Sequence, residues 1–434
     1  MNGFNKRPTE YDEAIEAELY YTAKSMSKKG SSLFNRIKHD IMLYGRRATC
    51  RLDRLGYQYL SKDSKVNIIY LVAESFPEQA LDILSRYEKT IGKSRSRIAK
   101  IAIENHTGKK CAFNLEEVCK KNNTIEDRAS LSLVKENQVD VNDFDEKFLN
   151  LVKITNLEIK KQASEYKMEG LEDLLVSIIV PARNVGKYID RCLQSLLNQV
   201  HKNIEIIVVD DFSEDDTLKK IKSYADRRIR VITHDCQSGP YIARNNALSV
   251  AKGTFFTFLD GDDYAHPERI RLHLLKHCSG DEKLICTMSQ WFRINEGGHV
   301  SDRKVWPLVR LNIGSMFALR EEVISKIGFF HEIMHGADNE YFHRIKTAFG
   351  KESIDKIRLP LTYATRRNDS LTASREFGYS GRFDNPDRRI YWESWYSWHR
   401  RHRDTPDMLK YEKGMNVPFY IPNGMKVNKQ SGIA

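Results

Sequence analysis

Four short apolar runs in the middle of the chain predict buried β-strands. They are VSIIV from residue 176, IEIIVV from 204, IRVIT from 229 and TFFTFL from 254. Nearly continuous runs of Val, Ile and Phe are typical of strands that a parallel sheet buries on both faces. Helical patterns between the first, second and fourth runs give the order β-α-β-α-β-α-β. We therefore predict an α/β domain with a mostly parallel sheet flanked by helices.

The first run is followed by an amphipathic helix. Its apolar positions keep helical spacing, at Ile189, Cys192, Leu193, Leu196, Leu197 and Val200, as in a helix that packs one face on a sheet. The turn before this helix has no GxGxxG motif, whose glycines let a backbone approach a dinucleotide's pyrophosphate. A nicotinamide-dependent oxidoreductase is therefore disfavoured.

Acidic residues stand where the later strands should end. They are Asp210 and Asp211, then Asp235, then Asp260, Asp262 and Asp263. Ligands of open α/β sheets bind at the carboxyl ends of the strands, so these carboxylates should line one crevice. Asp260 and Asp262 can point into one small volume, and Mg²⁺ and Mn²⁺ prefer oxygen ligands completed by substrate phosphates. A divalent metal with a sugar nucleotide fits this acidic rim.

The rest of the composition narrows the class of protein. The 434 residues have a formal net charge of +11, which favours anionic partners such as nucleotide diphosphates or an anionic lipid surface. Seven single cysteines without CxxC spacing argue against a disulfide framework or a zinc site. No signal peptide or membrane span is apparent, so we expect a cytoplasmic protein. No nucleic-acid recognition module is found, so we expect no nucleic-acid partner.

Three regions are predicted along the chain. Residues 1–172 read as a helical region that could mediate oligomerisation or bind a protein partner, and residues 173–375 as the α/β domain. Residues 376–434 form a tail with an aromatic and basic helix, whose Tyr391, Trp392, Trp395, Trp398, His399 and His402 share one face. That face is expected to dock on the α/β domain or on a partner. A peripheral contact with the inner face of the cell membrane is the alternative.

A set of motifs gives the α/β domain a family resemblance. In order they are VSIIVPARN, IEIIVVDDFSEDDT, GPYIARNNALSVAKGTFFTFLDGDD, GSMFALREEVISKIGFF and HGADNEYFHRI, spread over roughly residues 174–372. They closely resemble the inverting family 2 glycosyltransferases with the GT-A fold, such as bacterial capsule and lipopolysaccharide enzymes. The resemblance implies metal-dependent transfer of a sugar from a UDP-sugar to a hydroxyl of a growing glycan or glycolipid, with inversion.

The resemblance also implies roles for residues on the donor side. Pro181, Ala182, Arg183 and Asn184 would line the nucleotide pocket, Asp211 would bind the uracil, and Arg244 would lie on the nucleotide side. Asp260 would contact the ribose or the metal, and Asp262 would bind the Mn²⁺ or Mg²⁺ that carries the diphosphate. Arg367 stands at the His position of the Arg-x-His that relatives often have, and we expect Arg366 or Arg367 to contact the diphosphate.

On the acceptor side, Asp338 matches the family's general base. Ala337 replaces the acidic neighbour that most members have, and Glu340 is the fallback base. Two other readings remain open: a GT-A scaffold or binding protein that has lost catalysis, and a nucleotidyltransferase. The retained Asp262 and Asp338 argue against the first, and the lack of a Gly-rich or Lys-bearing phosphate loop after the first strand argues against the second.

Overall fold

The computed structural model describes residues 52, 57–108, 130, 133–134, 159, 170–279, 283–296, 298–300, 305–367 and 386–427. The chain divides into two compact units. The first comprises Met1–Asp140, Ser301–Leu308 and Asn368–Glu393, and the second Val141–Val300, Val309–Arg367 and Ser394–Ala434. The predicted boundaries near residues 172 and 375 stay predictions.

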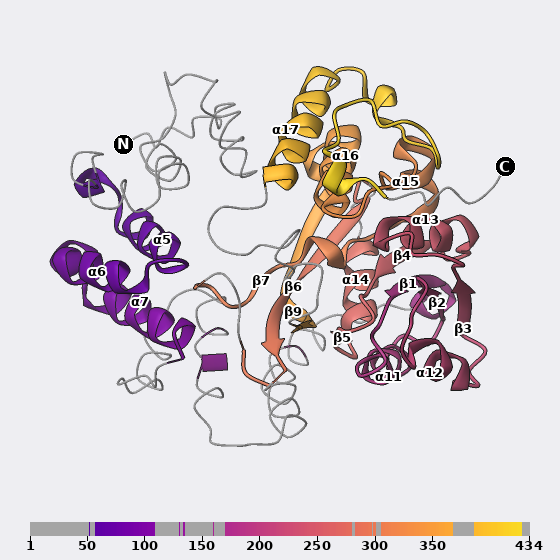
Figure 1. The fold of residues 1–434 in the computed structure, drawn as a ribbon, viewed down its shortest axis with the longest axis horizontal. Helices are drawn as coiled ribbons and strands as arrows, with labels where there is room; N and C mark the ends of the chain where they lie inside the picture. Colours follow the sequence, from indigo (N-terminus) through magenta and orange to yellow (C-terminus); the bar gives the residue numbers. More distant parts are fainter. Residues whose placement is uncertain are drawn as a thin grey trace. The chain divides into compact units, whose positions relative to one another are not determined.

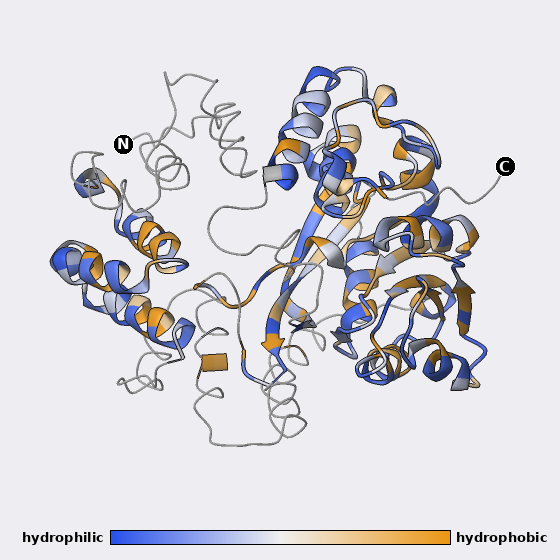
Figure 2. Ribbon diagram, in the orientation of Figure 1, coloured by the Kyte–Doolittle hydropathy of each residue, from blue (hydrophilic) through white to orange (hydrophobic). Residues whose placement is uncertain are grey.

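Three helices form the described core of the first unit, and they confirm the predicted helical character there. They are α5 (Lys62–Ala73), α6 (Pro77–Ile91) and α7 (Lys93–His106), shown in purple in Figure 1. Ser61 caps α5, because its Oγ accepts a hydrogen bond from the backbone N–H of Ser64 at 3.2 Å. All three helices carry hydrophobic and hydrophilic residues (Figure 2), and those of α6 separate into two faces. The buried apolar side chains make up the core of this unit.

The four predicted strands are present in the second unit. They are β1 (Val176–Ala182), β2 (Ile204–Asp210), β3 (Ile229–Thr233) and β4 (Phe255–Phe258). They pair in parallel in the spatial order β3-β2-β1-β4. Every residue of β1, β2 and β4 is buried, whereas β3 is only partly covered because it lies at the edge of the sheet. The continuous apolar runs of the sequence thus correspond to strands that are buried on both faces.

The sheet continues beyond β4 as a mixed sheet. The further strands are β5 (Tyr264–Ala265), β6 (Cys286–Asn295), β7 (Arg310–Leu311), β8 (Phe317–Leu319) and β9 (Ile354–Arg366). Strand β8 runs antiparallel to β4 and β6, whereas β9 runs parallel to β6 and antiparallel to β5. Helices flank this sheet, which confirms the expected GT-A-like α/β fold (Figure 1).

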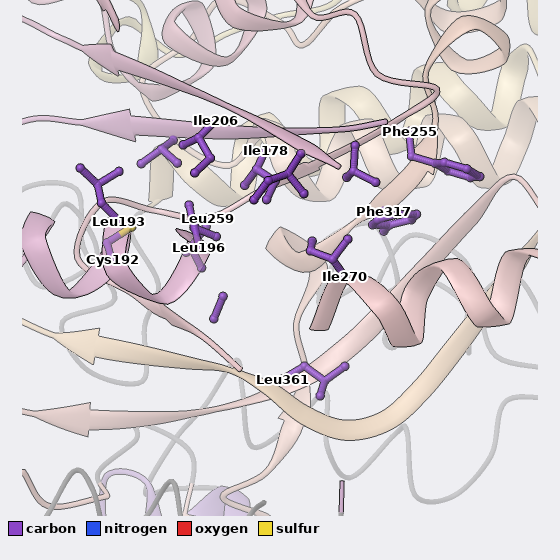
Figure 3. Packing of buried hydrophobic residues seen from close by; sticks show 14 of the residues in the cluster. Ile178, Cys192, Leu193, Leu196, Ile206, Phe255, Leu259, Ile270, Phe317 and Leu361 are labelled. Atoms are coloured by element: carbon purple, nitrogen blue, oxygen red, sulfur yellow. The ribbon is translucent and has the colours of Figure 1, made fainter. Parts of the chain in front are cut away.

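Helices connect and cover the strands. They are α11 (Ile189–Leu197), α12 (Thr217–Ser223), α13 (Pro240–Val250), α14 (Arg269–His277), α15 (Arg320–Ile327), α16 (Ala337–Phe349) and α17 (Pro386–Arg401). Figure 3 shows Cys192, Leu193 and Leu196 of α11 with Ile178 and Ile206 of the sheet in one apolar cluster. The predicted apolar face of this helix is therefore correct except at its end. Val200 is 45% exposed, because α11 ends at Leu197.

The C-terminal segment, described over residues 394–427, belongs to the second unit and packs beside α16. The ring of Trp395 lies 5.1 Å from that of His343 on α16, and His399 lies 5.2 Å from the same ring. Farther on, the backbone N–H of Phe329 donates to the carbonyl of Tyr411 at 2.8 Å. Docking of the aromatic face within the chain is thus confirmed for Trp395 and His399, which contact α16 of the α/β domain. Within the described part of the chain, no helix has both the length and the apolar character to cross a membrane.

Candidate functional site

The loop after β4 carries the two aspartates predicted to bind metal. The backbone N–H of Gly261 donates to the carbonyl of Pro181 at 3.2 Å, and that of Asp263 donates to the carbonyl of Asp260 at 2.9 Å. This tight turn holds the loop against the end of β1. The side chain of Asp260 is 53% exposed and that of Asp262 is 14% exposed. Both carboxylates therefore lie at the carboxyl end of the parallel strands, as the sequence predicted.

The loop after β1 is fixed to the loop after β2. Asn184 adopts a left-handed conformation with φ of 49°, which asparagine tolerates better than most residues. Its backbone N–H donates to Ser213 Oγ at 3.1 Å, and its Oδ1 accepts from the backbone N–H of Glu214 at 2.9 Å. Pro181 and Ala182 are the last residues of β1, so the four predicted pocket residues are contiguous at this rim. The described residues offer no hydrogen-bond partner to the buried Nη1 of Arg183.

Asp211 is held by partners within the protein. Its Oδ1 accepts from the backbone N–H of Ser238 and its Oδ2 from that of Gly239, both at 2.8 Å, and His234 Nδ1 lies 2.8 Å from Oδ1. Burial opposes ionisation of this carboxyl, but the hydrogen bonds from His234 and from the two backbone N–H groups outweigh burial and lower its pKa. Asp211 thus anchors the segment that begins α13. Its contact with the uracil stays a prediction.

Two arginines pair with the two aspartates of the loop after β4. Arg244 on α13 places Nη2 2.7 Å from Asp260 Oδ1, and Arg367 places Nε 2.8 Å from Asp262 Oδ2. Arg367 also donates through Nη1 to the carbonyl of Asn184 at 3.0 Å. It therefore joins the loop after β1 to the loop of residues 260–263, called the acidic turn below. Arg366 is exposed, at the last position of β9. Arg367 therefore contacts the acidic turn, and the diphosphate contact predicted for Arg366 and Arg367 stays a prediction.

The carboxylates of the acidic turn fit a divalent cation that would also be bound by a substrate's phosphate oxygens. Burial raises the pKa of Asp262 and Asp260 raises it further, although Arg367 acts in the opposite direction. Burial, followed by the nearby Asp262 and Asp260, raises the pKa of Asp263 well above its ordinary value. In the part of the chain that the structure describes, no three His, Cys, Asp or Glu residues are placed to hold a metal by themselves. One or two carboxylates completed by phosphate oxygens are the usual arrangement for Mg²⁺.

Asp338 lies in the first turn of α16 and contacts α13. Tyr241 on α13 donates a hydrogen bond from its hydroxyl to Asp338 Oδ1 at 3.0 Å. Gly336 precedes the helix with φ of 81°, a left-handed conformation that favours glycine. Tyr241 was not singled out from the sequence, although it lies three residues before Arg244 on the same helix. The spacing i, i+3 places two side chains on one helix face, and that was the available signal.

Glu340 does not reach the site, so the expectation that it is the fallback base is wrong. Its side chain is fully buried. Arg344 pairs with it through two hydrogen bonds of 2.9 Å and 2.8 Å, and His399 Nε2 lies 2.9 Å from Oε1. Burial disfavours the carboxylate, but the charge of Arg344 and the neighbouring His331 and His399 lower the pKa of Glu340 strongly. A carboxylate enclosed in this way cannot take a proton from an acceptor.

The same cluster predicts that acid destabilises the fold. Burial lowers the pKa of His331 and of His343 to about 3 each, against about 6.5 in an unfolded chain. Between those values the unfolded state binds more protons than the folded state, so stability falls as pH falls from about 6.5. Thermal unfolding at pH 7.5, 6.0 and 5.0 should show this decline. The decline should be shallower for His343→Gln, and an unchanged slope in that variant would contradict the assignment.

Comparisons with known proteins identify the family of the α/β domain. The family model described as Glycosyl transferase family 2 matches residues 177–345. The UDP-Glc:alpha-D-GlcNAc-diphosphoundecaprenol beta-1,3-glucosyltransferase WfgD of Escherichia coli is 42% identical over 93 residues, which is 21% of this chain and 37% of the relative. The chondroitin synthase of Pasteurella multocida is 37% identical over 136 residues, or 31% of this chain and 14% of the relative. The chain thus spans well under half the length of either protein.

Among solved structures, S. aureus TarS 1-349 in complex with UDP is similar at 24% identity and a TM-score of 0.37. The similarity covers 45% of this chain and 61% of that chain.

The mixed α/β sheet with an acidic rim at its strand ends defines a GT-A-like domain. Residues 177–345 of the chain form a glycosyl transferase family 2 domain, which confirms the family that the motifs indicated.

Proposed function

We propose that the protein is a metal-dependent, inverting glycosyltransferase that moves a sugar from a UDP-sugar to a hydroxyl of a growing glycan. Its place would be the synthesis of a bacterial surface polysaccharide. Asp260 and Asp262 would hold Mn²⁺ or Mg²⁺ with the diphosphate, and Asp338 would act as the general base. The family 2 domain supports the class of reaction. The similarity to WfgD, whose name specifies UDP-Glc and a diphosphoundecaprenol acceptor, supports the classes of donor and acceptor.

One observation carries this proposal: Arg244 connects the loop of Asp260 to the proposed base. It pairs with Asp260, and its guanidinium lies 5.2 Å from the ring centroid of Tyr241, whose hydroxyl donates to Asp338. Its guanidinium pairs with Asp260 at 2.7 Å, and the charges of Asp260 and Asp338 both contribute to raising its pKa although its burial acts against this. Asp260 follows β4 and Asp338 lies in the first turn of α16, so the 77 residues 261–337 separate two carboxylates whose charges both act on this one arginine. An acidic loop that could hold the donor, with a nearby carboxylate that could act as the base, is the combination that the proposed reaction needs.

The chemistry follows from where charge develops. An acceptor hydroxyl becomes a useful nucleophile only when a positioned carboxylate takes its proton, which is the role of Asp338. A divalent cation, when bound, would stabilise the charge that the leaving diphosphate gains. Arg244 and Arg367, which pair with Asp260 and Asp262, would donate charge-assisted hydrogen bonds to the same diphosphate. Because the base and the leaving group would act on opposite faces of the sugar, the product would have the inverted configuration.

The donor site is tested by binding of UDP with and without Mn²⁺, measured by calorimetry. We expect wild-type protein to bind UDP at least about tenfold more tightly with Mn²⁺, a difference of about 1.4 kcal/mol. Asp262→Ala should abolish that difference, because it removes a metal ligand. Asp226→Ala is a matched control, since Asp226 also pairs with an arginine, Arg228, at 2.8 Å but lies outside the site. Metal dependence that survives in Asp262→Ala would exclude Asp262 as a ligand.

Two results would favour the rival classes of protein. Tight binding of UDP with no turnover of any UDP-sugar would favour the catalytically silent scaffold. Release of pyrophosphate from a nucleoside triphosphate would favour the nucleotidyltransferase. The predicted peripheral membrane contact and the oligomer or partner contact through residues 1–170 stay predictions.

A further inference from the structure

We propose that Tyr241 is a positioning residue, which orients Asp338 and couples that base to the donor side of the site through α13. The inference rests on the proposed function, because it takes Asp338 as the general base. It adds a residue whose only part in the reaction is to hold another side chain in place.

The hydroxyl of Tyr241 makes two hydrogen bonds at the start of α16. It donates to Asp338 Oδ1 at 3.0 Å and accepts from the backbone N–H of Gly336 at 3.0 Å. The N–H bond fixes the hydroxyl oxygen, so the proton of the hydroxyl is directed to the carboxylate. One carboxylate oxygen of Asp338 is therefore held by Tyr241. The other oxygen would take the proton from the hydroxyl of the sugar acceptor. A group that acts as a base must be held within hydrogen-bond reach of that proton.

The ring of Tyr241 is held independently of its hydroxyl. It is 5% exposed and lies 5.6 Å from the ring of Phe330, and the guanidinium of Arg244 lies 5.2 Å from its centroid. Phe330 is in turn fixed to α13, because its backbone N–H donates to Asn245 Oδ1 and its carbonyl accepts from Asn245 Nδ2, both at 2.9 Å. Removing the hydroxyl should therefore leave the ring and α13 in place, while Asp338 and the N–H of Gly336 lose their partner.

Helix α13 links the two sides of the site. Tyr241 contacts the base, and Arg244, one turn later, pairs with Asp260 of the acidic turn. The beginning of the same helix is anchored through Gly239, whose N–H donates to Asp211 Oδ2. A shift of α13 on donor binding would therefore reach Asp338 directly. Misplacing a reacting group by about 1 Å can lower a rate about a hundredfold.

The test uses full-length wild type, Tyr241→Phe and a matched control. Tyr224→Phe is suitable, because the hydroxyl of Tyr224 also donates to a carboxylate at 3.0 Å, that of Asp190, away from the site. UDP release with water as the acceptor would be followed for UDP-glucose, UDP-galactose and UDP-N-acetylglucosamine. Calorimetry would give the affinity for UDP with Mn²⁺. We expect Tyr241→Phe to lower kcat about ten- to a hundredfold with unchanged donor KM and unchanged UDP affinity. Tyr224→Phe should match wild type.

The outcomes separate the inference from the proposed function. Wild type that releases UDP, together with Tyr241→Phe of equal kcat, would overturn the positioning role and leave the function standing. A lower kcat accompanied by weaker UDP binding would also overturn it, since the substitution would then have disturbed the donor site or the fold. Wild type that releases no UDP from any of the three donors would overturn the proposed function and the inference with it.

Discussion

Substitution of Asp338 by Asn is expected to slow sugar transfer by about 10² to 10⁴ fold, which is the contribution that a positioned general base makes. Asn keeps the size of the side chain and can still accept the hydrogen bond from Tyr241, so the start of α16 should stay in place. The acceptor hydroxyl, however, has no carboxylate to take its proton. The affinity for UDP with Mn²⁺ should therefore be unchanged, while kcat decreases by the factor given above.

A nearby acid provides the control for this experiment. Glu332 lies in the loop that precedes α16 and is partly buried, but it has no proposed role in the reaction. Glu332→Gln should retain wild-type kcat. Equal loss of activity in Glu332→Gln and Asp338→Asn would attribute the effect to the loop and not to a base. Full activity in Asp338→Asn would exclude Asp338 as the base, and the burial of Glu340 leaves that residue unable to replace it.

The second large effect is expected on stability. Glu340→Gln should lower the free energy of unfolding by about 3 to 5 kcal/mol, the usual result of removing one partner from a buried ion pair. The side chain of Arg344 is 1% exposed and would keep its charge without the carboxylate. Arg344 donates to the carbonyls of Ile327 and Phe329 at 2.9 Å. If the Arg344 side chain moved after losing its carboxylate partner, these hydrogen bonds would weaken and the segment between α15 and α16 would loosen. Urea unfolding of the purified full-length variants measures the change.

An exposed ion pair in the same region gives the comparison. Lys326 and Asp407 lie 3.3 Å apart with side chains 38% and 90% exposed, and they join α15 to the C-terminal segment. Pairs of this kind contribute about 0 to 1 kcal/mol, so Asp407→Asn should have little effect. A small loss in Glu340→Gln, similar to that in Asp407→Asn, would show that the buried cluster does not hold α16 to the C-terminal segment.

Local pattern was sufficient for the strands and for the acidic rim. The runs at β1, β2 and β4 are continuous in apolar residues because both faces of those strands are covered. Strands of this kind can therefore be recognised from the sequence alone. Asp260 and Asp262 were identified because a DxD after a buried strand must lie at the rim of a parallel sheet. The end of α11 was less well predicted. Val200 continues the apolar spacing, but the chain leaves the helix at Leu197 and exposes it.

Pairings between distant segments could not be read from the sequence. Glu340 and Asp338 lie two residues apart on the first turn of α16, and the sequence left Glu340 as the fallback to Asp338 as the base. The helix turns by about 200° over two residues, so one carboxylate lies near Tyr241 and the other is enclosed by Arg344 and His399. Which side of α16 faces the interior depends on the C-terminal segment that packs on it.

The sequence by itself thus determined the parallel strands, the acidic turn and the family 2 domain, because each rests on residues close together in the chain. Only the tertiary structure decided the partners of those residues: Arg367 for Asp262, Arg244 for Asp260 and Tyr241 for Asp338. The physical reason is that periodicity reports whether a side chain is buried, whereas a pairing between charges depends on how separate elements pack. No single segment encodes that packing.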